Sequence, residues 1–334
     1  MATLTVRQVI GLGRKDLPRC IGYYTVQKRD KSDVTIQNYK RGTGGRSSFS
    51  GEVVTVFGST GFLGRFIVNR LGKTGSQIIL PWRGDDARCW GMKPSADLGQ
   101  LIMHEIDVRN DDDIRKVLKY STAVVNLIGR EFETRNFNYD DVHNVTARKI
   151  AKYSKEAGVK KLLHFSSLNA SPNPPECLKK GGSDFLKSKY AGEVAVREEF
   201  PEAIIFRPAD IFVRRYVNFK TPLWQKGQKT IKKPVYVTDV TDGVMSALND
   251  PDAAGKTFEL VGPGSYYLCD ILDFIYKCAR YPTGNICGIG PYFKARAQFF
   301  DKVQFLSHGY PRFVLDRLEK VRLLYLLCIH LYTW

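Results

Sequence analysis

Cysteine and histidine are scarce and scattered in this sequence. Its seven cysteines form no C-x-x-C motif, which argues against a zinc site and against the disulfide framework of a secreted domain. The five histidines form no cluster either, so we expect no metal site and no catalytic group built on histidine. A protein of a reducing compartment fits this usage best.

Long apolar runs are missing as well. The most apolar stretch, residues 323–331, is about half as long as the roughly 18 residues that a transmembrane helix requires. We therefore expect no transmembrane segment. With 334 residues, 43% of them hydrophobic, the chain can still bury one large core, or the cores of a major domain and a smaller one.

Acidic residues are few relative to basic ones. There are 34 aspartates and glutamates against 51 lysines and arginines, so the formal net charge is +17. Net charge governs encounters with charged partners, and this excess admits nucleic acid, anionic lipid or an acidic protein surface. Charge alone does not choose among them.

The N-terminal region has the composition of a targeting sequence. Residues 1–29 contain six basic side chains and a single acid, Asp16, with apolar residues between them. We predict a mitochondrial transit peptide over residues 1–30, with a disordered basic arm as the alternative. Glycine and serine are frequent just before Glu52, and residues 31–50 are predicted to be a flexible lead-in.

A dinucleotide-binding pattern begins at residue 53. The β-rich run 53–57 leads directly into three glycines at a spacing of three residues, and a helical pattern follows. The first glycine permits a tight turn, the second lets the backbone approach a pyrophosphate, and the third lets the helix pack closely on the strand. The helix N-terminus then favours the bound anion. The predicted cofactor contacts of this turn are Gly58, Ser59, Thr60, Gly61, Phe62, Leu63 and Gly64.

Further cofactor contacts are predicted where later strands end. Arg83 follows the strand predicted at 77–80, where an acid is typical of NAD sites and an arginine suits the 2′-phosphate of NADP. Asp85 and Asp86 follow closely, so a solvated surface arginine is the alternative. The contacts predicted at or just after the ends of the next two strands are Asp107, Val108, Leu127, Ile128 and Gly129.

Strand and helix patterns alternate through this region, and such alternation predicts an α/β fold, a Rossmann-type doubly wound parallel sheet. After the strand 77–80, the predicted elements are a strand at 101–106, a helix at 112–120, a strand at 123–128, a helix at 145–157 and a strand at 161–166. We assign an NADP(H)-binding domain to residues 51–208. A smaller C-terminal lobe is assigned to residues 209–300, with a strand at 256–261, and a basic aromatic tail to residues 301–334.

Taken in order, these motifs resemble the short-chain dehydrogenase superfamily in its extended and atypical branches. The match runs from about residue 51 to about residue 263 and includes Arg207-Pro208. The superfamily's serine falls at Ser166, Ser167 or Leu168, and we take Ser166 as a cofactor contact. Longer strings, among them residues 125–130, make the chain most similar to the accessory-subunit family of mitochondrial respiratory complex I (NADH:ubiquinone oxidoreductase) that has this fold.

The resemblance implies a tightly held, structural NADPH. It implies a position on the matrix side of the inner mitochondrial membrane, peripheral to it, with other complex I subunits of the peripheral arm as partners. The implied role is to support assembly and stability of that arm near its junction with the membrane. Contact with anionic lipid is a further alternative for the basic aromatic segments. We expect no nucleic acid partner.

Active members of the superfamily carry Tyr-x-x-x-Lys on the helix after the serine strand. The tyrosine exchanges a proton with the substrate, and the lysine favours its deprotonation and holds the nicotinamide ribose. In this chain Phe185 occupies the tyrosine position and Lys189 the lysine position. Phenylalanine cannot exchange a proton, and shifting the register to Lys187 places Ser183 at the tyrosine position. We predict no catalytic residue and keep Lys189 as a ribose contact.

Two other functions stay open at this point. The first is an NADP-dependent reductase or epimerase acting on a lipophilic substrate, which Phe185 opposes. The second is an RNA-binding member of the atypical branch, suggested only by the net charge. The sequence lacks the aromatic and basic signatures of the usual RNA-binding modules.

Overall fold

The computed structural model describes residues 48–84, 87–134, 136–176, 181–211, 221–223, 228, 230–278, 280 and 286–288. The predicted transit peptide, nearly all of the predicted lead-in and the predicted tail at 301–334 lie outside these residues.

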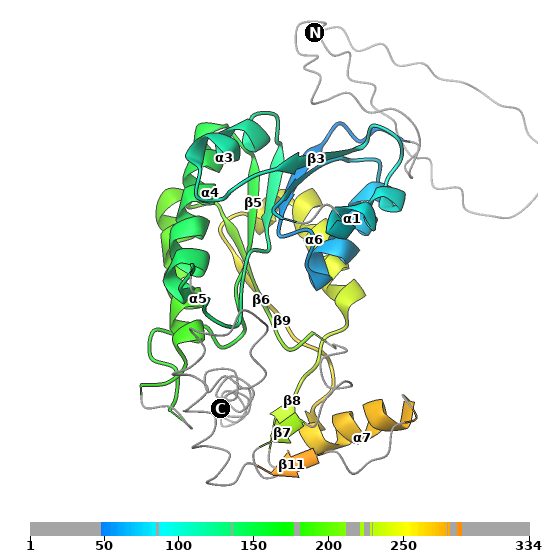
Figure 1. Ribbon diagram of the computed structural model, residues 1–334, viewed down its shortest axis with the longest axis vertical. Helices are drawn as coiled ribbons and strands as arrows, with labels where there is room; N and C mark the ends of the chain where they lie inside the picture. Colours follow the sequence, from blue (N-terminus) through cyan, green and yellow to red (C-terminus); the bar gives the residue numbers. More distant parts are fainter. Residues whose placement is uncertain are drawn as a thin grey trace, which may run out of the picture. The chain divides into compact units, whose positions relative to one another are not determined.

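A seven-stranded parallel sheet forms the centre of the fold (Figure 1). Its strand order is β3-β2-β1-β4-β5-β6-β9. Successive strands are added on one side of β1 as far as β3 and then on its other side from β4 onward, so the order reverses between β1 and β4. In sheets of this kind, ligands bind outside the carboxyl ends of the strands at the reversal point. The predicted Rossmann-type, doubly wound fold is confirmed. The strands are β1 (Val53–Phe57), β2 (Gln77–Trp82), β3 (Leu101–Glu105), β4 (Ala123–Asn126), β5 (Lys161–Phe165), β6 (Ile204–Pro208) and β9 (Thr257–Leu260).

Helices cover both faces of the sheet because its strands are apolar on both sides. On one face, α1 (Phe62–Lys73) and α6 (Val237–Asn249) pack over Val54 and Val56 of β1. On the other face, α3 (Asp111–Leu118) and α4 (Thr146–Glu156) pack over Phe57 and Val124, and α5 (Asp184–Glu199) lies beside α4. Figure 1 shows these two layers.

Local sequence signals account for several element boundaries. Asn110 caps α3, because its side-chain oxygen accepts the N–H of Asp112 at 3.2 Å, as the polar pair Asn110-Asp111 predicts. The helix predicted at 145–157 is α4, but a π-helical turn, η4 (Asp141–Val145), precedes it. Gly192 of α5 packs against this turn so closely that a Cβ atom there would overlap the carbonyl oxygen of His143. The remaining short helices of the main fold are α2 (Ala87–Trp90), η3 (Lys93–Ser95) and η7 (Pro251–Ala253).

The structure differs from the expected division at residue 208. The strand predicted at 256–261 is β9, which pairs with β6 as the seventh strand of the main sheet, and α6 packs on α1. Both elements were expected in the smaller lobe. Alternating patterns predict a strand but not its partner, because strand pairing is a non-local contact. The elements outside the main sheet are β7 (Thr221–Leu223), β8 (Ile231–Lys232), β10 (Tyr266–Tyr267), α7 (Leu268–Cys278) and β11 (Ile286–Gly288).

The strands among these elements form two small sheets. Strand β10 pairs with β8 in an antiparallel pair, and β11 pairs with β7 in a parallel pair. Within the described part of the chain, no helix has the length and apolar character that crossing a bilayer would require.

Candidate functional site

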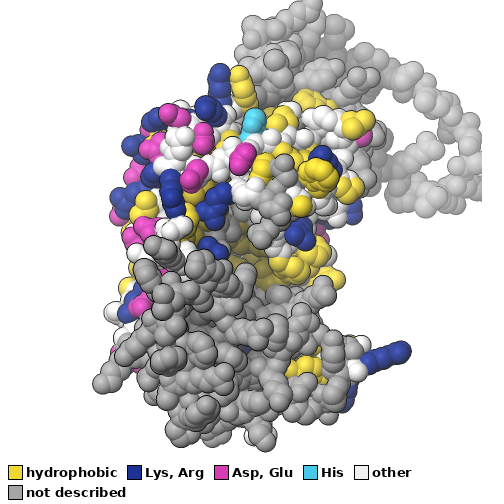
Figure 2. All heavy atoms as spheres, viewed as in Figure 1, with side chains coloured by type: hydrophobic (Ala, Val, Ile, Leu, Met, Phe, Trp, Pro, Cys, Tyr) yellow, Lys and Arg dark blue, Asp and Glu magenta, His cyan; other side chains and the backbone are white. Residues whose placement is uncertain are grey.

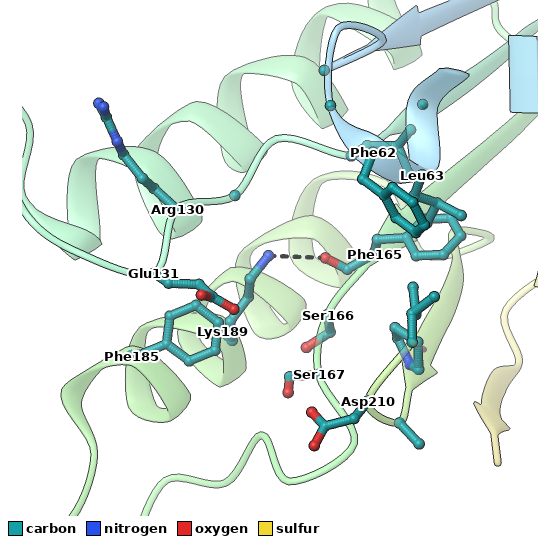
Figure 3. Close-up of a pocket in the computed structure, with 18 of the residues that line it drawn as sticks. Phe62, Leu63, Arg130, Glu131, Phe165, Ser166, Ser167, Phe185, Lys189 and Asp210 are labelled. Atoms are coloured by element: carbon teal, nitrogen blue, oxygen red, sulfur yellow. Dashed lines mark hydrogen bonds between the residues drawn. The ribbon is translucent and has the colours of Figure 1, made fainter. Parts of the chain in front are cut away.

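A cavity of about 390 Å³ lies at the carboxyl ends of β1, β4, β5 and β6. Its wall combines the glycine turn before α1, the loop after β4, the loop after β5 and one face of α5 (Figure 3). This is the reversal point of the sheet, where the fold is expected to bind a ligand. The structure therefore brings together segments that lie more than a hundred residues apart in the sequence.

The glycine turn leaves no room for a side chain at Gly58 or Gly64. Gly58 has a φ of 76°, and a Cβ atom there would lie 3.0 Å from the carbonyl carbon of Leu127. A Cβ atom on Gly64 would lie 2.5 Å from the carbonyl oxygen of Ser59. Gly61 is the N-cap of α1 and has no side chain to cap it, and the first residues of the helix line the cavity. A helix N-terminus exposed in this way is suited to bind a phosphate group.

Phe185 lies at the opposite end of the cavity within a small aromatic cluster. Its ring centroid is 5.2 Å from that of His143 and 6.1 Å from that of Tyr139, both in edge-on geometry. The Tyr139 hydroxyl donates to the carbonyl oxygen of Glu131 at 3.0 Å. None of the described residues that line the cavity is a tyrosine or a histidine. At position 185 the cavity therefore presents a phenyl ring in place of the tyrosine of active superfamily members.

His143 holds the loop after β4 in place. Its Nε2 atom accepts the backbone N–H of Arg130 at 3.1 Å, and its Nδ1 atom lies 2.8 Å from Ser188 Oγ. Ser188 in turn donates to the carbonyl oxygen of Phe185 at 2.9 Å. Because Nε2 accepts a hydrogen bond, a neutral ring carries its hydrogen on Nδ1. His143 thus links the cavity loop to α5 and is not part of the cavity lining.

Lys189 is buried beside Phe185 on the same face of α5. Its ammonium group donates to the carbonyl oxygen of Phe165 at 3.0 Å, as Figure 3 shows, and its side chain is 6% exposed. Lys187 instead forms an ion pair with Asp184 at 3.7 Å. Ser183 caps α5 by accepting the N–H of Leu186 at 3.4 Å. Phe185 and Lys189 therefore line the cavity, whereas Ser183 and Lys187, the pair in the shifted register, do not.

Ser166 offers an unused polar atom to the cavity. Its hydroxyl is buried and has no hydrogen-bond partner among the described residues, although Ser166 lines the wall. A buried polar atom without a partner costs free energy unless a ligand or water satisfies it. Ser167 also lines the wall, whereas Leu168 packs against the core beneath α1 and α6. Two of the three alternatives for the serine position therefore reach the cavity.

His164 is buried within the sheet, on strand β5. Asn126 Nδ2 donates to His164 Nδ1 at 3.2 Å, and Asn126 Oδ1 accepts the N–H of Ile128 at 3.0 Å. Burial and the nearby charge of Lys189 lower the pKa of His164 to about 3. His164 is therefore neutral at any physiological pH, and sequence reasoning assigned it no role.

A second cavity, of about 350 Å³, lies at the carboxyl ends of β2 and β3. Arg83 and Asp107, both predicted cofactor contacts, line it together. Five residues that sequence reasoning missed complete the wall: Arg109, Arg130, Thr134, Asn136 and Phe137. Arg109 directly follows Val108 and Arg130 directly follows Gly129, both predicted contacts. Their basic side chains at these positions are a sequence signal from which they could have been predicted. Phe137 carries no such signal.

The predicted contacts fall into three groups. Nine line the first cavity, and Arg83 and Asp107 line the second. Ser59, Thr60, Val108 and Ile128 line neither; Ser59 is fully buried, and the latter two pack against the core beneath α3 and α4. The nine in the first group are Gly58, Gly61, Phe62, Leu63, Gly64, Leu127, Gly129, Ser166 and Lys189.

A doubly wound sheet with a glycine turn at its reversal point defines a protein of the Rossmann-type class. Residues 54–212 match the NAD dependent epimerase/dehydratase family. Solved structures agree on the fold alone. The dTDP-glucose 4,6-dehydratase of Streptomyces venezuelae, with NAD and TYD bound, aligns with a TM-score of 0.59 at 14% identity over 71% of this chain and 84% of that chain. The dTDP-glucose 4,6-dehydratase of Bacillus anthracis, in complex with NAD, aligns with a TM-score of 0.58 at 13% identity. The alignment covers 82% of this chain and 96% of that chain.

Sequence relatives are much closer. The chain is 49% identical over 274 residues to the mitochondrial NADH dehydrogenase (ubiquinone) 1 alpha subcomplex subunit 9 of Mus musculus, covering 75% of this chain and 71% of that protein. It is 38% identical over 283 residues to the mitochondrial NADH-ubiquinone oxidoreductase 40 kDa subunit of Neurospora crassa, covering 80% and 73%. The chain belongs to this family of complex I subunits, as the sequence motifs predicted.

Proposed function

We propose that this chain is a non-catalytic accessory subunit of mitochondrial respiratory complex I that binds NADPH as a structural element. The observation that carries the proposal is the contrast within one cavity. The phosphate-binding geometry of the glycine turn is present, whereas Phe185 occupies the position of the proton-exchanging tyrosine. Binding without turnover is the function that such a site supports best.

The lining residues fit a dinucleotide. The glycine turn and the N-terminus of α1 would hold the pyrophosphate, because Gly61 lets the backbone approach it and the uncapped first turn of the helix faces the cavity. The unpartnered hydroxyl of Ser166 and the ammonium group of Lys189 would bind the nicotinamide half. Arg83 would bind the 2′-phosphate that distinguishes NADPH from NADH. When bound, the nicotinamide would supply hydride-transfer chemistry, which this chain does not use.

Phe185 cannot carry out the proton transfer that the tyrosine performs in active members of the superfamily. Loss of a general acid or base typically lowers a rate by about 10² to 10⁴. Tyr139 does not replace it, because its hydroxyl is engaged with the carbonyl oxygen of Glu131 and it does not line the cavity. These observations oppose the alternative of a reductase or epimerase acting on a lipophilic substrate.

The family membership supports the proposed partners and location. The named relatives are mitochondrial subunits of NADH dehydrogenase, so we infer other complex I subunits of the peripheral arm as partners. We place the chain on the matrix side of the inner membrane, delivered by a transit peptide at residues 1–30, where it supports assembly and stability of that arm. Anionic lipid is a second contact that the net charge of +17 favours.

Surface charge gives no support to nucleic acid binding. Figure 2 shows basic and acidic side chains intermixed over α3, α4 and α5. Several form ion pairs, such as Arg148 with Glu198 and Lys149 with Asp111, both at 2.7 Å. A basic stripe of the kind that tracks a phosphate backbone is not formed on this face by the described residues.

Blue-native electrophoresis tests the subunit assignment. Mitochondria that contain the full chain are solubilised gently, and the chain is located beside an in-gel stain for NADH dehydrogenase activity. We expect it to migrate with the large stained complex. Migration only as a small free species would contradict the assignment and make a substrate screen the next step.

Thermal unfolding tests the structural role of the nucleotide. A ligand that binds only the folded state stabilises it by about 4 kcal/mol when its free concentration is a thousandfold above its Kd. We expect NADPH to raise the Tm of the full-length chain. A chain that purifies without nucleotide and has the same Tm with and without NADPH would contradict this part of the proposal.

A further inference from the structure

Three arginines from three different loops meet at the second cavity. Arg83 follows β2, Arg109 follows β3 and Arg130 follows β4, and all three line this space of about 350 Å³. Arg130 also borders the first cavity, so the two spaces adjoin at this residue. In Figure 3 its side chain extends away from the first cavity.

Phe137 holds two of these arginines. The guanidinium carbon of Arg109 lies 4.2 Å from the centre of the Phe137 ring, and that of Arg83 lies 5.0 Å from the same centre. A guanidinium group within about 6 Å of a ring centre is attracted to the ring face. One half-buried ring therefore fixes two flexible cations at one place.

Among the residues that the structure describes, the two cations have no acidic partner of their own. Neither Arg83 nor Arg109 forms an ion pair with a described carboxylate. Asp107 lines the cavity, but its Oδ1 atom accepts the backbone N–H of Arg109 at 3.0 Å. Bringing like charges together is unfavourable unless an anion joins them. The arrangement is suited to a ligand group with two negative charges.

We propose that Arg109 and Phe137 determine the preference of this chain for NADPH over NADH. Arg109 binds the adenosine 2′-phosphate beside Arg83, and Phe137 positions both guanidinium groups to receive it. A phosphomonoester is the matching chemical class, because guanidinium groups bind phosphate oxygens in a forked, charge-assisted geometry. A bare 2′-hydroxyl offers no compensating charge. This inference rests on the proposed dinucleotide binding and extends it beyond Arg83.

Calorimetric titration of the full-length chain tests the proposal. The probes are NADPH, NADH, 2′,5′-ADP, 5′-AMP and inorganic phosphate. The variants are Arg109→Gln and Phe137→Leu. The matched control is Arg115→Gln, because Arg115 also lies over an aromatic ring, that of Tyr153 at 4.6 Å, but lines neither cavity.

We expect Arg109→Gln to weaken the binding of NADPH and of 2′,5′-ADP about tenfold. Phe137→Leu should weaken the binding of both about threefold to tenfold. Binding of NADH and 5′-AMP should change less than about twofold in both variants, and the control should behave as the parent chain. The Tm of the nucleotide-free variants should also match that of the parent, which separates positioning from a general structural role.

The alternative outcomes are distinct. Equal losses for NADPH and NADH, or no loss for either, would overturn the assignment of Arg109 and Phe137 while leaving dinucleotide binding intact. If inorganic phosphate binds as tightly as 2′,5′-ADP, the site is a free-phosphate site and the proposal is wrong. If no dinucleotide binds the parent chain at all, the proposed function fails together with this inference.

Discussion

The two ends of the first cavity are built by different kinds of constraint. At the glycine-turn end, backbone packs on backbone, and a Cβ atom on Gly64 would lie 2.5 Å from the carbonyl oxygen of Ser59. At the Phe185 end, side chains pack on side chains: an aromatic cluster, a histidine and a lysine on α5. The first end therefore has no room for a side chain at Gly58 or Gly64. The second can exchange one side chain for another of similar size.

If the proposed function is right, this difference explains how the site keeps its ligand without the chemistry. Replacing a hydroxyphenyl ring by a phenyl ring removes one oxygen and the ability to exchange a proton, but little packing volume. The change leaves the glycine turn untouched, because Gly58 and Gly64 contact residues at the other end. An enzyme scaffold can therefore become a binding scaffold through one substitution of this kind.

The substitution Gly64→Ala should have the largest effect. Its new Cβ atom would lie 2.5 Å from the carbonyl oxygen of Ser59, so α1 must move away from the turn. We expect a loss of about 3 kcal/mol in the free energy of unfolding, by analogy with overpacked cores, and a loss of NADPH binding. Denaturant unfolding and nucleotide titration of the full-length chain measure both.

Gly91→Ala provides the matched control for that experiment. No heavy atom lies within 4 Å of the position of its Cβ atom, and its φ is not in the left-handed region. The control should change stability by less than about 1 kcal/mol. If Gly64→Ala behaved like Gly91→Ala, the claim that the turn end is the rigid half of the cavity would be wrong.

An intermediate effect is expected from the buried histidine behind the Phe185 end. The pKa of His164 is about 3 in the folded chain, below the usual value of 6.5, so the unfolded chain binds its proton first. This contribution to stability is complete above pH 6.5 and is lost as the pH falls towards 3, by about 1.4 kcal/mol between pH 7.5 and 5.5. Denaturant unfolding at the two pH values measures it.

His164→Leu should remove this part of the pH dependence. The variant loses stability at both pH values, because Asn126 Nδ2 loses its acceptor, but the difference between the two pH values should shrink by about 1.4 kcal/mol. His104→Asn is the control, since His104 is exposed on β3 and should leave the difference unchanged. An equal pH dependence in His164→Leu and the parent chain would show that His164 is not the group that titrates.

The fold was predictable because its signals are local. The alternation of strand and helix patterns, the glycine turn and the Asn110 cap each depend on a few neighbouring residues. Phe185 and Lys189 are four residues apart on one helix, so their common face also follows from spacing. Family resemblance then identified the chain's relatives before any contact was known.

What sequence reasoning missed depends on contacts between distant segments. Strand β9 joins the main sheet through β6, about fifty residues earlier in the chain, and no pattern in either strand specifies that pairing. Phe137 meets Arg83 and Arg109 only because three loops converge at the ends of β2, β3 and β4. Burial of His164 likewise depends on the helices packed over β5. Sequence patterns predict where helices and strands form. Which loops converge on one site can be seen only in the three-dimensional structure.

The smallest effect is expected from restoring the missing hydroxyl. In Phe185→Tyr the ring can keep its edge-on packing against His143 and Tyr139, and the added oxygen can reach the cavity, because Phe185 lines it. We expect a change of less than about 1 kcal/mol in stability and less than about twofold in NADPH affinity. Calorimetry and denaturant unfolding check these values against Phe185→Leu, which removes the ring packing and should cost more. A large loss of NADPH binding in Phe185→Tyr would mean that the Phe185 end is as tightly constrained as the glycine turn. The contrast between the two ends would then fail.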